Sequence, residues 1–400
     1  MAAPTLTVAI RPAWRMVSAL GVGQILSWGS SYYLLAVVAP VIAADTGWSL
    51  PWIVGGLALG LLTAGLVSPR LGRAIERHGG RPILIAASCL FAVGLSALAL
   101  AANLATYLAA WLVLGLAMGA GLYDAAFATL GRALGQRARQ AIGALTLFGG
   151  FASTVCWPLS AYLVGTLGWR GTCLAYAGLQ LLVVLPLYRL GVPPLPEARP
   201  MAAAAAHDSP QPVASPPVGP FLLLAATITL GSAVSALLSV HLLALLQGLG
   251  VGLAAAVALG AVVGPSQVAA RAIELVVARY HHPVWTMLAS TVLVAGGVAL
   301  LGSGVPLIPL ALAGYGAGIG IASIARGTLP LALFGADGYA TVMGRLALPS
   351  LLAQAGSPIL GAYLMERLGP RATLAGLLAT AMLDIALALA LLAWTRRRLT

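Results

Sequence analysis

The sequence contains no lysine, and charged residues of either sign are rare. Only nine of its 400 residues are Asp or Glu, and charged residues make up 8% of the chain against 60% hydrophobic residues. Soluble domains average roughly 25% charged and 45–50% apolar residues. This shortage of charge excludes an ordinary soluble domain. Together with a mean hydropathy of +1.00, it predicts an integral membrane protein built from α-helical spans.

Cysteine is scarce too, and Cys89, Cys156 and Cys173 lie inside apolar runs at unrelated spacings. A disulfide framework or a metal site needs paired spacings in polar loops, so we interpret them as small buried hydrophobic residues. The chain also lacks a nucleotide-binding loop, a His/Cys metal motif and a nucleophile elbow. We therefore expect neither an enzyme nor a cofactor. The alternative to this expectation is a membrane-bound sensor or enzyme.

The net charge of +12 comes from 21 arginines. They are dispersed among short loops rather than gathered on one domain, so we expect no nucleic-acid partner. Basic short loops stay on the cytoplasmic side of a membrane, which explains these arginines more simply. With the N-terminus inside, 18 arginines fall on the cytoplasmic side, and only Arg170, Arg367 and Arg371 fall outside.

Apolar runs near 20 residues long predict twelve helical spans. By residue number they are 16–43, 51–67, 82–100, 106–130, 141–166, 171–190, 220–248, 252–277, 284–301, 306–327, 344–366 and 373–394. Residues 191–219 are rich in proline and small residues, which predicts a flexible cytoplasmic linker. We thus expect an all-α membrane protein with two pseudo-symmetric six-helix bundles, 1–190 and 220–400, and both termini in the cytoplasm. The first span would serve as the insertion signal, without a cleaved leader.

A short basic segment between the second and third spans carries the most specific motif. Its spacing is Gly-x-x-x-acid-Arg-x-Gly-x-Arg, which we interpret as a tight cytoplasmic turn. The motif residues are Gly72, Arg73, Glu76, Arg77, Gly79 and Arg81. They resemble the loop signature of the major facilitator superfamily of transporters, although that family usually has Asp at the acid position and a basic residue where Gly80 stands here. The resemblance implies that this loop meets neighbouring helix ends and stabilises an outward-open state, whereas a merely orienting basic loop is the alternative.

Further residues support the resemblance over nearly the whole chain. The run 119–124 in the fourth span echoes 318–323 in the tenth, and Gly-Trp-Arg at 168–170 also resembles the superfamily. Two related six-span halves are typical of secondary transporters. The resemblance implies a multi-pass transporter in a bacterial inner membrane, a monomer whose partners are the lipid bilayer, a small-molecule substrate and protons.

Arg271 in the eighth span is the candidate substrate-binding residue. The string Gln267-x-x-x-Arg271 resembles the Asp-x-x-x-Arg of the monocarboxylate branch, and the oxalate–formate branch also carries an arginine in this span. A guanidinium fork suits a planar carboxylate. The alternatives are that Arg271 reaches back to the cytoplasmic surface, or that Glu274 neutralises it at i+3.

Other ionisable residues inside spans need an explanation because a charge there costs about 2.5–3.5 kcal/mol. Asp124 in the fourth span is a candidate proton-coupling residue, or else a structural partner for Arg326. We place Arg326 at a helix end because Gly327 and Pro330 follow it, although it could also bind substrate. For Asp384 in the twelfth span we expect structural pairing. His241 could relay protons, although a neutral hydrogen-bonded role is favoured.

Polar and aromatic side chains crowd the first span, as is typical of helices that line a cavity. Gln24 and Trp28 share a helical face, and Tyr32 and Tyr33 follow, with an interfacial aromatic belt as the alternative. The segment resembles the first span of the monocarboxylate-type branch. In that branch a Gly-Trp-Ser sequence follows the span, and here Gly-Trp-Ser stands at 47–49. Gln354 in the eleventh span is a further candidate substrate contact.

These residues predict a secondary transporter that moves a small, monocarboxylate-like organic anion, coupled to protons, by alternating access. The alternative is a proton-driven efflux pump for drugs or hydrophobic compounds. Glycines 143, 149 and 150 in the fifth span resemble the glycine-rich antiporter motif but lack its Gly-Pro centre.

Overall fold

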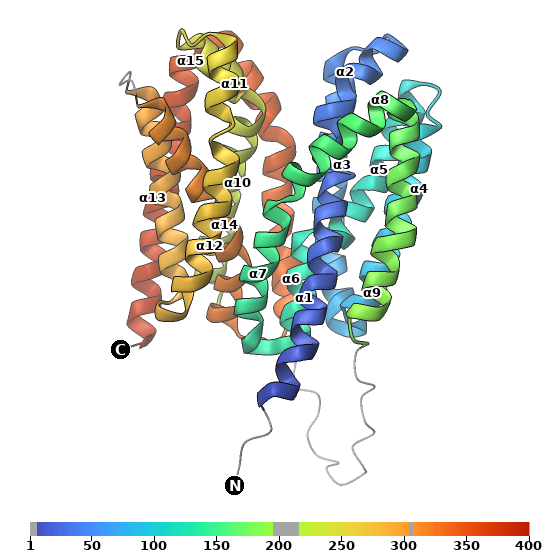
Figure 1. Cartoon of the computed structure of the whole chain (residues 1–400). Coiled ribbons are helices and arrows are strands. Elements are labelled where there is room, and N and C mark those ends of the chain that lie inside the picture. Colours follow the sequence, from blue (N-terminus) through green and yellow to red (C-terminus); the bar gives the residue numbers. More distant parts are fainter. Residues whose placement is uncertain (1–5, 195–215, 304–306, 400) are drawn as a thin grey trace.

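A computed structural model describes residues 6–194, 216–303 and 307–399. Every regular element within these ranges is a helix, and the helices stand side by side as one bundle (Figure 1). The predicted linker at 191–219 falls largely on residues outside the described ranges, so its flexibility stays a prediction.

The N-terminal half runs from α1 to α9 and lies mostly on one side of the bundle. Its elements are α1 (Leu6–Gly29), α2 (Leu34–Thr46), α3 (Leu50–His78), α4 (Gly80–Ala99), α5 (Leu104–Gly121), α6 (Tyr123–Leu134), η1 (Gly135–Arg137), α7 (Ala138–Gly150), α8 (Ala152–Leu179), η2 (Gln180–Val184) and α9 (Leu185–Gly191).

The C-terminal half runs from α10 to α15 on the other side. Its elements are α10 (Val218–Gly248), α11 (Leu253–Gly260), α12 (Val263–Val277), η3 (Ala278–Tyr280), α13 (Pro283–Gly302), α14 (Ile308–Phe334) and α15 (Tyr339–Leu399). The start of α1 and the end of α15 lie at the same end of the bundle, which we call the terminal end; the opposite one is the far end.

Within the described ranges, nine helical runs are long and apolar enough to cross a membrane. Two of them, Leu104–Gly191 with 88 residues and Tyr339–Arg397 with 59, are far longer than one crossing of about 20 residues requires. Each contains a glycine with a non-helical backbone, Gly168 at φ 68° and Gly369 at φ 80°. These breaks coincide with the predicted boundaries between the fifth and sixth and between the eleventh and twelfth spans.

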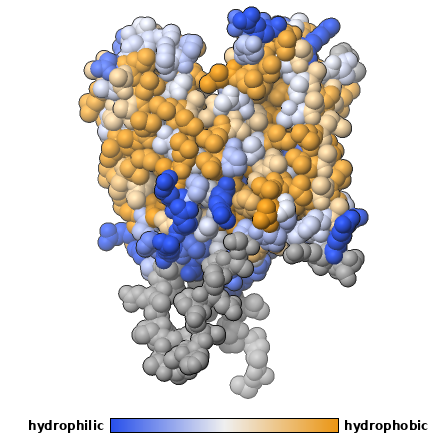
Figure 2. Space-filling model, turned by 180° about the vertical axis from the view of Figure 1, so that it is seen from behind, coloured by the Kyte–Doolittle hydropathy of each residue, from blue (hydrophilic) through white to orange (hydrophobic). Residues whose placement is uncertain are grey.

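Large apolar side chains cover the outside of the bundle. Leu182 is 80% exposed, and Tyr162, Ile359 and Ile273 are more than 60% exposed. Figure 2 shows hydrophobic residues over the middle of one face, with hydrophilic residues gathered toward the two ends. An apolar surface this extensive is incompatible with water and fits a lipid environment.

The basic motif contains the predicted tight turn, but nearly all of its residues are helical rather than part of a loop. Gly72–His78 are the last turns of α3, Gly80 and Arg81 begin α4, and only Gly79 between them is non-helical, at φ 77° and ψ 167°. Hydropathy marks the length that lies in lipid, whereas a helix continues into water as long as its residues favour helix, as arginine does. The turn is therefore a single glycine, whose missing Cβ permits the positive φ.

The prediction that a helix ends near Arg326 is wrong. Helix α14 continues to Phe334, with Pro330 inside it, and Arg326 lies in its interior. Proline is tolerated inside buried spans when neighbouring groups satisfy the loosened backbone. Pro330 leaves the carbonyl of Arg326 without its helical donor, and at the next residue the Tyr339 hydroxyl donates to the carbonyl of Gly327 at 2.6 Å.

Four spans that were predicted as continuous are interrupted. The first breaks at residues 30–33, the fourth at Leu122, which has ψ −167°, the fifth at Phe151, and the eighth at residues 261–262. Asp124 consequently lies in the first turn of α6, where the partial positive charge of a helix N-terminus stabilises a carboxylate.

The two halves touch at the terminal end. Gly72 of α3 and Gly344 of α15 pack backbone against backbone: a Cβ on either glycine would lie within 3.0 Å of the other's Cα. At the far end the molecule is notched between the two halves (Figure 2). The arrangement is closed on the side of the termini and opened on the other.

Candidate functional site

A cavity of about 250 Å³ lies between the halves and is lined by both. The N-terminal half contributes aromatic residues of α1, the turn after it and α6, and the C-terminal half contributes hydroxyl-bearing residues of α10, α13 and α14. The charged residues in its wall are Asp124, Arg271, Arg326 and Asp384. A cavity of this size admits only a small ligand, and its convergent polar groups make it the candidate binding site.

Asp124 and Arg326 form a bidentate ion pair across the two halves. Arg326 donates from Nε to Oδ1 at 2.9 Å and from Nη2 to Oδ2 at 2.8 Å. Nη2 also donates to the Ser350 hydroxyl at 2.9 Å. The side chains are 17% and 18% exposed. This geometry matches one of the two interpretations of Asp124, that of a structural partner for Arg326. It also places Arg326 in the cavity wall rather than at the cytoplasmic surface.

Arg271 is 6% exposed and lies in the cavity wall. Its Nε donates to the carbonyl of Gly320 at 3.1 Å, Nη1 to the carbonyl of Thr146 at 3.1 Å, and Nη2 to the amide oxygen of Gln267 at 3.4 Å. Among the residues that the structure describes, no acid forms an ion pair with it. Neither alternative from the sequence is observed: Arg271 does not reach the surface, and Glu274 binds Thr286 instead.

Two glycines of α7 make room for this arrangement. A Cβ on Gly150 would lie 2.5 Å from Nη1 of Arg271, and a Cβ on Gly149 would collide with the Tyr123 hydroxyl. The close approach of Arg271 from the other half thus requires glycine at position 150, and Tyr123 of the same half requires it at position 149. The resemblance to an antiporter motif is not needed to explain these two glycines.

An aromatic cluster forms the N-terminal wall. The Trp28 ring lies 5.5 Å from Tyr32, 6.0 Å from Tyr33 and 5.2 Å from Tyr123, between centroids, and Trp157 meets Tyr33 edge to face at 6.0 Å. Trp28, Tyr32 and Tyr33 line the cavity as the sequence predicted for this span, and so does Gln354.

Three predicted site residues lie behind the wall instead. Gln24 is fully buried and donates to the Gly121 carbonyl at 2.7 Å, just before the break at Leu122, while its oxygen accepts from Trp28 at 3.1 Å. Gln267 supports Arg271, and His241 is hydrogen-bonded to the carbonyl of Pro358 at 2.7 Å. These three side chains do not line the cavity, and the hydrogen-bonded role of His241 is the one that the sequence favoured.

Asp384 and Thr227 are wall residues that the sequence did not single out for function. Asp384 is 5% exposed and Thr227 1%. Neither Oδ1 of Asp384 nor the Thr227 hydroxyl has a hydrogen-bond partner in the described part of the chain. The structural pairing that we expected for Asp384 is therefore not found, because α10 presents Gly231 and no basic residue to it.

The basic motif joins the halves at the terminal end. Oε2 of Glu76 accepts from the backbone nitrogen of Ala340, in the first turn of α15, at 3.1 Å. Arg132 of α6 lies 3.4 Å from Oε1 of the same carboxylate. A carboxylate at a helix N-terminus is stabilised by the helix dipole, so Glu76 links α3 to α15.

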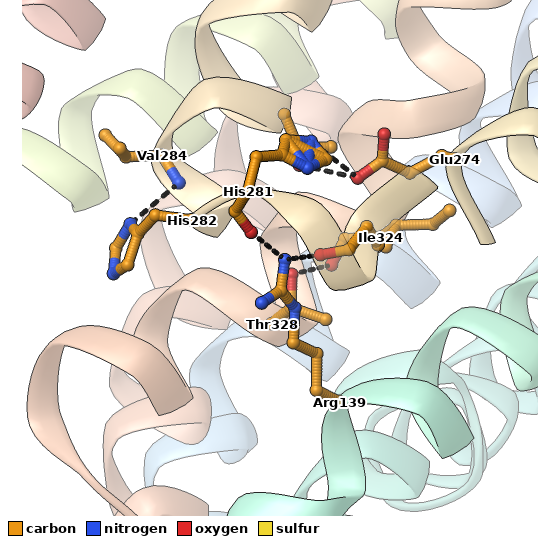
Figure 3. Close-up of polar contacts among 9 residues, drawn as sticks. Arg139, Glu274, His281, His282, Val284, Ile324 and Thr328 are labelled. Atoms are coloured by element: carbon orange, nitrogen blue, oxygen red, sulfur yellow. Dashed lines mark hydrogen bonds and ion pairs between the residues drawn. The ribbon is translucent and has the colours of Figure 1, made fainter. Parts of the chain in front are cut away.

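A second link joins α7 to η3 and to the residue that follows it (Figure 3). Arg139 donates from Nη2 to the carbonyl of His281 at 2.6 Å and to that of Ala278. Beside it, Oε1 of Glu274 accepts from the Thr286 hydroxyl at 2.6 Å and lies 3.5 Å from His281. Burial and the charge of Arg139 lower the pKa of His282. It therefore stays neutral and accepts at Nδ1 from Val284.

Removing the negative charge of Glu76 is expected to loosen the terminal end. In Glu76→Gln the helix-dipole contribution of about 0.3–1 kcal/mol is lost, so the equilibrium should shift about two- to fivefold toward separated halves. The measurement is the rate of thiol labelling at Ser68→Cys, buried beside this interface, in a chain without its three native cysteines. Glu366→Gln, at an exposed acid of α15, is the control, and equal labelling in both variants would refute the role.

Comparisons with known proteins agree with this architecture. The sequence profile of the Major Facilitator Superfamily matches residues 20–344. The chain is similar to monocarboxylate transporter 11 of Mus musculus, with 31% identity over 197 residues, which cover 47% of this chain and 42% of that protein. The match thus spans less than half the length of that curated relative.

Among solved structures, the chain resembles the human organic anion transporter MFSD10 (TETRAN), with a TM-score of 0.75 and 17% identity over 94% of this chain and 99% of that one. It also resembles the proton:xylose symporter XylE bound to 6-bromo-6-deoxy-D-glucose, with a TM-score of 0.69 and 12% identity over 94% of both chains. At these identities the two likenesses concern the fold alone.

Proposed function

The chain belongs to the Major Facilitator Superfamily of transporters, and from this premise we propose that it moves a small, monocarboxylate-like organic anion across a membrane, coupled to protons. The observation that carries the proposal is the guanidinium of Arg271. It is buried in the cavity wall and has no acidic partner among the described residues. A buried charge without a counter-charge is costly, so a substrate that supplies the missing negative charge would be held strongly.

The hydrogen bonds of Arg271 leave room for such a substrate. Guanidinium has five N–H donors, and protein groups accept from three of them. One N–H remains on each terminal nitrogen, which suits the two oxygens of a carboxylate. The cavity volume of about 250 Å³ and the aromatic wall favour a small anion with an apolar body, in agreement with the monocarboxylate transporter and the organic anion transporter that the chain resembles.

We further propose the topology that the apolar runs predict. The long run Leu104–Gly191 would cross the bilayer three times and Tyr339–Arg397 twice, giving twelve spans in two six-helix bundles, 1–190 and 220–400. The arginines of the basic motif lie at the terminal end, which the positive-inside rule assigns to the cytoplasm. The protein would then act as a monomer in a bacterial inner membrane.

In this proposal the conformation is outward-open, and transport requires the halves to rock apart at the terminal end. The links of Glu76 to α15 and of Arg139 to η3 would break, and the notch at the far end would close. The ion pair of Asp124 and Arg326 spans the halves beside the cavity and holds them in register meanwhile.

The second candidate is a proton-driven efflux pump for hydrophobic compounds. The aromatic cluster around Trp28 favours it, because aromatic faces bind drug-like rings. Asp124, the residue proposed to carry its proton, is engaged by Arg326, so a pump would have to use Asp384 instead. The anion proposal uses Arg271, which efflux of neutral compounds leaves unexplained.

The proposal is tested with purified protein in liposomes under an imposed pH gradient. We expect a radiolabelled panel of acetate, lactate, pyruvate and oxalate to include at least one anion whose uptake exceeds that of protein-free liposomes and rises when the outside is acidic. A panel of cationic dyes serves as the comparison. Gradient-driven dye movement without carboxylate uptake would replace the anion proposal with the efflux pump.

A further inference from the structure

The strongest unexplained feature of the cavity is a pair of buried polar groups without partners, on facing helices. Asp384 is 5% exposed and Thr227 1%, and within the described ranges neither Oδ1 of Asp384 nor Oγ1 of Thr227 is hydrogen-bonded. Both line the cavity. Such groups are rare in folded proteins and each needs a specific reason.

Asp384 lies at the middle of its helical segment. Gly369, where the helix breaks, and Leu399, where it ends, are each 15 residues away, which corresponds to roughly 22 Å of helix in either direction. The carboxyl group is therefore as far from both aqueous ends as this segment allows. A residue at this depth cannot extend its side chain to the surface, so water and ions reach it through the cavity.

Helix α10 provides the space beside this carboxyl group. A Cβ on Gly231 would lie 3.3 Å from Oδ2 of Asp384, so glycine lets the acid rest against the helix. Thr227 is one turn earlier on the same face. A hydroxyl both donates and accepts, so a protonated carboxyl group could donate to Thr227 or to water, and an ionised one could accept from either of them.

The charged and titratable groups around the cavity are few. Helices α10 and α13, which pack against α15, contribute only hydroxyls and apolar groups to the wall. Helices α12 and α14 contribute Arg271 and Arg326, α6 contributes Asp124, and three tyrosines complete the set. Asp124 and Arg326 cancel each other. The charge of the empty cavity is thus set by Arg271 and by whether Asp384 carries a proton.

We propose that Asp384 is the proton-binding site that couples transport, taking one proton for each anion bound at Arg271; this inference rests on the proposed anion transport. With Asp384 ionised, the empty cavity is neutral because Arg271 balances it. With Asp384 protonated, Arg271 is unbalanced and an anion restores neutrality. These two neutral states are the ones in which a low-dielectric site can close at least cost.

The same balance excludes the other two states from crossing. An anion with ionised Asp384 leaves one excess negative charge in the closed site, and a protonated empty site leaves one excess positive charge. Proton and anion therefore travel together and the empty protein returns without either, which makes transport electroneutral with one proton per anion. Sodium is the competing cation, but Asp384 is the one carboxylate of the described wall that no arginine holds.

The test uses Asp384→Asn, which keeps the shape of the side chain and permanently resembles the protonated state. It should bind the anion and exchange labelled for unlabelled anion at a rate within about threefold of wild type. Because the empty protein cannot return in a neutral state, net uptake driven by a pH gradient should fall about 100-fold. Asp337→Asn, which makes the same substitution at an exposed acid outside the cavity wall, serves as the matched control and should lose far less.

Each outcome decides something different. Gradient-driven net uptake retained in Asp384→Asn, or exchange lost together with uptake in a folded variant, would overturn the assignment of the coupling proton to Asp384. Uptake by wild type that depends on a sodium gradient and not on pH would overturn the proton itself. A wild-type protein that moves no carboxylate would instead defeat the proposed function, whatever Asp384 does.

Discussion

Arg271→Ala is expected to reduce carboxylate uptake by at least about 100-fold, measured as the ratio of the maximal rate to the half-saturation concentration. Losing one partner of a buried charge pair costs about 3–5 kcal/mol, and every 1.4 kcal/mol is a factor of ten. Arg271→Lys separates charge from shape. It retains a positive charge but offers no fork and cannot make the three bonds to Gly320, Thr146 and Gln267 together, so we expect it to recover only a small part of the activity.

The matched control is Arg279→Ala, at an exposed arginine on the same segment of chain two turns later. It removes the same charge outside the cavity and should leave uptake within about twofold of wild type, as substitutions of surface charges usually do. Thermal unfolding in detergent verifies that both variants fold. Uptake by folded Arg271→Ala at the wild-type rate would show that the anion binds elsewhere.

Composition and apolar runs were enough to predict the helical membrane architecture, because helices are what satisfy the backbone in lipid when no barrel forms. The first span's aromatic residues and Arg271 were also identified as candidates for sound reasons, since polar groups in apolar runs require neighbours or a ligand. Their cavity placement follows from the fold, but substrate contact stays a prediction.

The interruptions of the helices could not be predicted from the residues where they occur. Leu122 and Phe151 are not helix breakers, and the break at Leu122 is stabilised by Gln24 from another helix, 97 positions earlier in the chain. The contacts between side chains of the two halves could not be predicted from the sequence either. Arg271 uses the Thr146 carbonyl instead of the nearby Glu274, and Asp384 has Gly231 beside it where a basic residue was expected. Which partner each side chain contacts depends on how distant segments of the chain pack together.

Breaking the ion pair between Asp124 and Arg326 is expected to destabilise the protein unequally, depending on which partner is removed. Asp124→Asn leaves a guanidinium that is 18% exposed and cannot lose its proton, so about 3 kcal/mol of stability should be lost. Arg326→Gln leaves a carboxyl group that can take up a proton and become neutral, and the loss should be smaller. The double variant Asp124→Asn with Arg326→Gln should recover most of the stability, because no charge stays unpaired.

The thermal unfolding midpoints of the four proteins form a double-mutant cycle, with Arg345→Gln as a control that removes an exposed arginine from the same half. Coupling of several degrees between the two positions would establish the pair as the bond that holds the halves in register. Asp124 would then have no free carboxylate to carry a proton, since its oxygens accept from Arg326 throughout the outward-open state. Additive effects, with Asp124→Asn as stable as wild type, would refute this and restore Asp124 as the proton-coupling residue, in which case Asp384 could not be the sole coupling site.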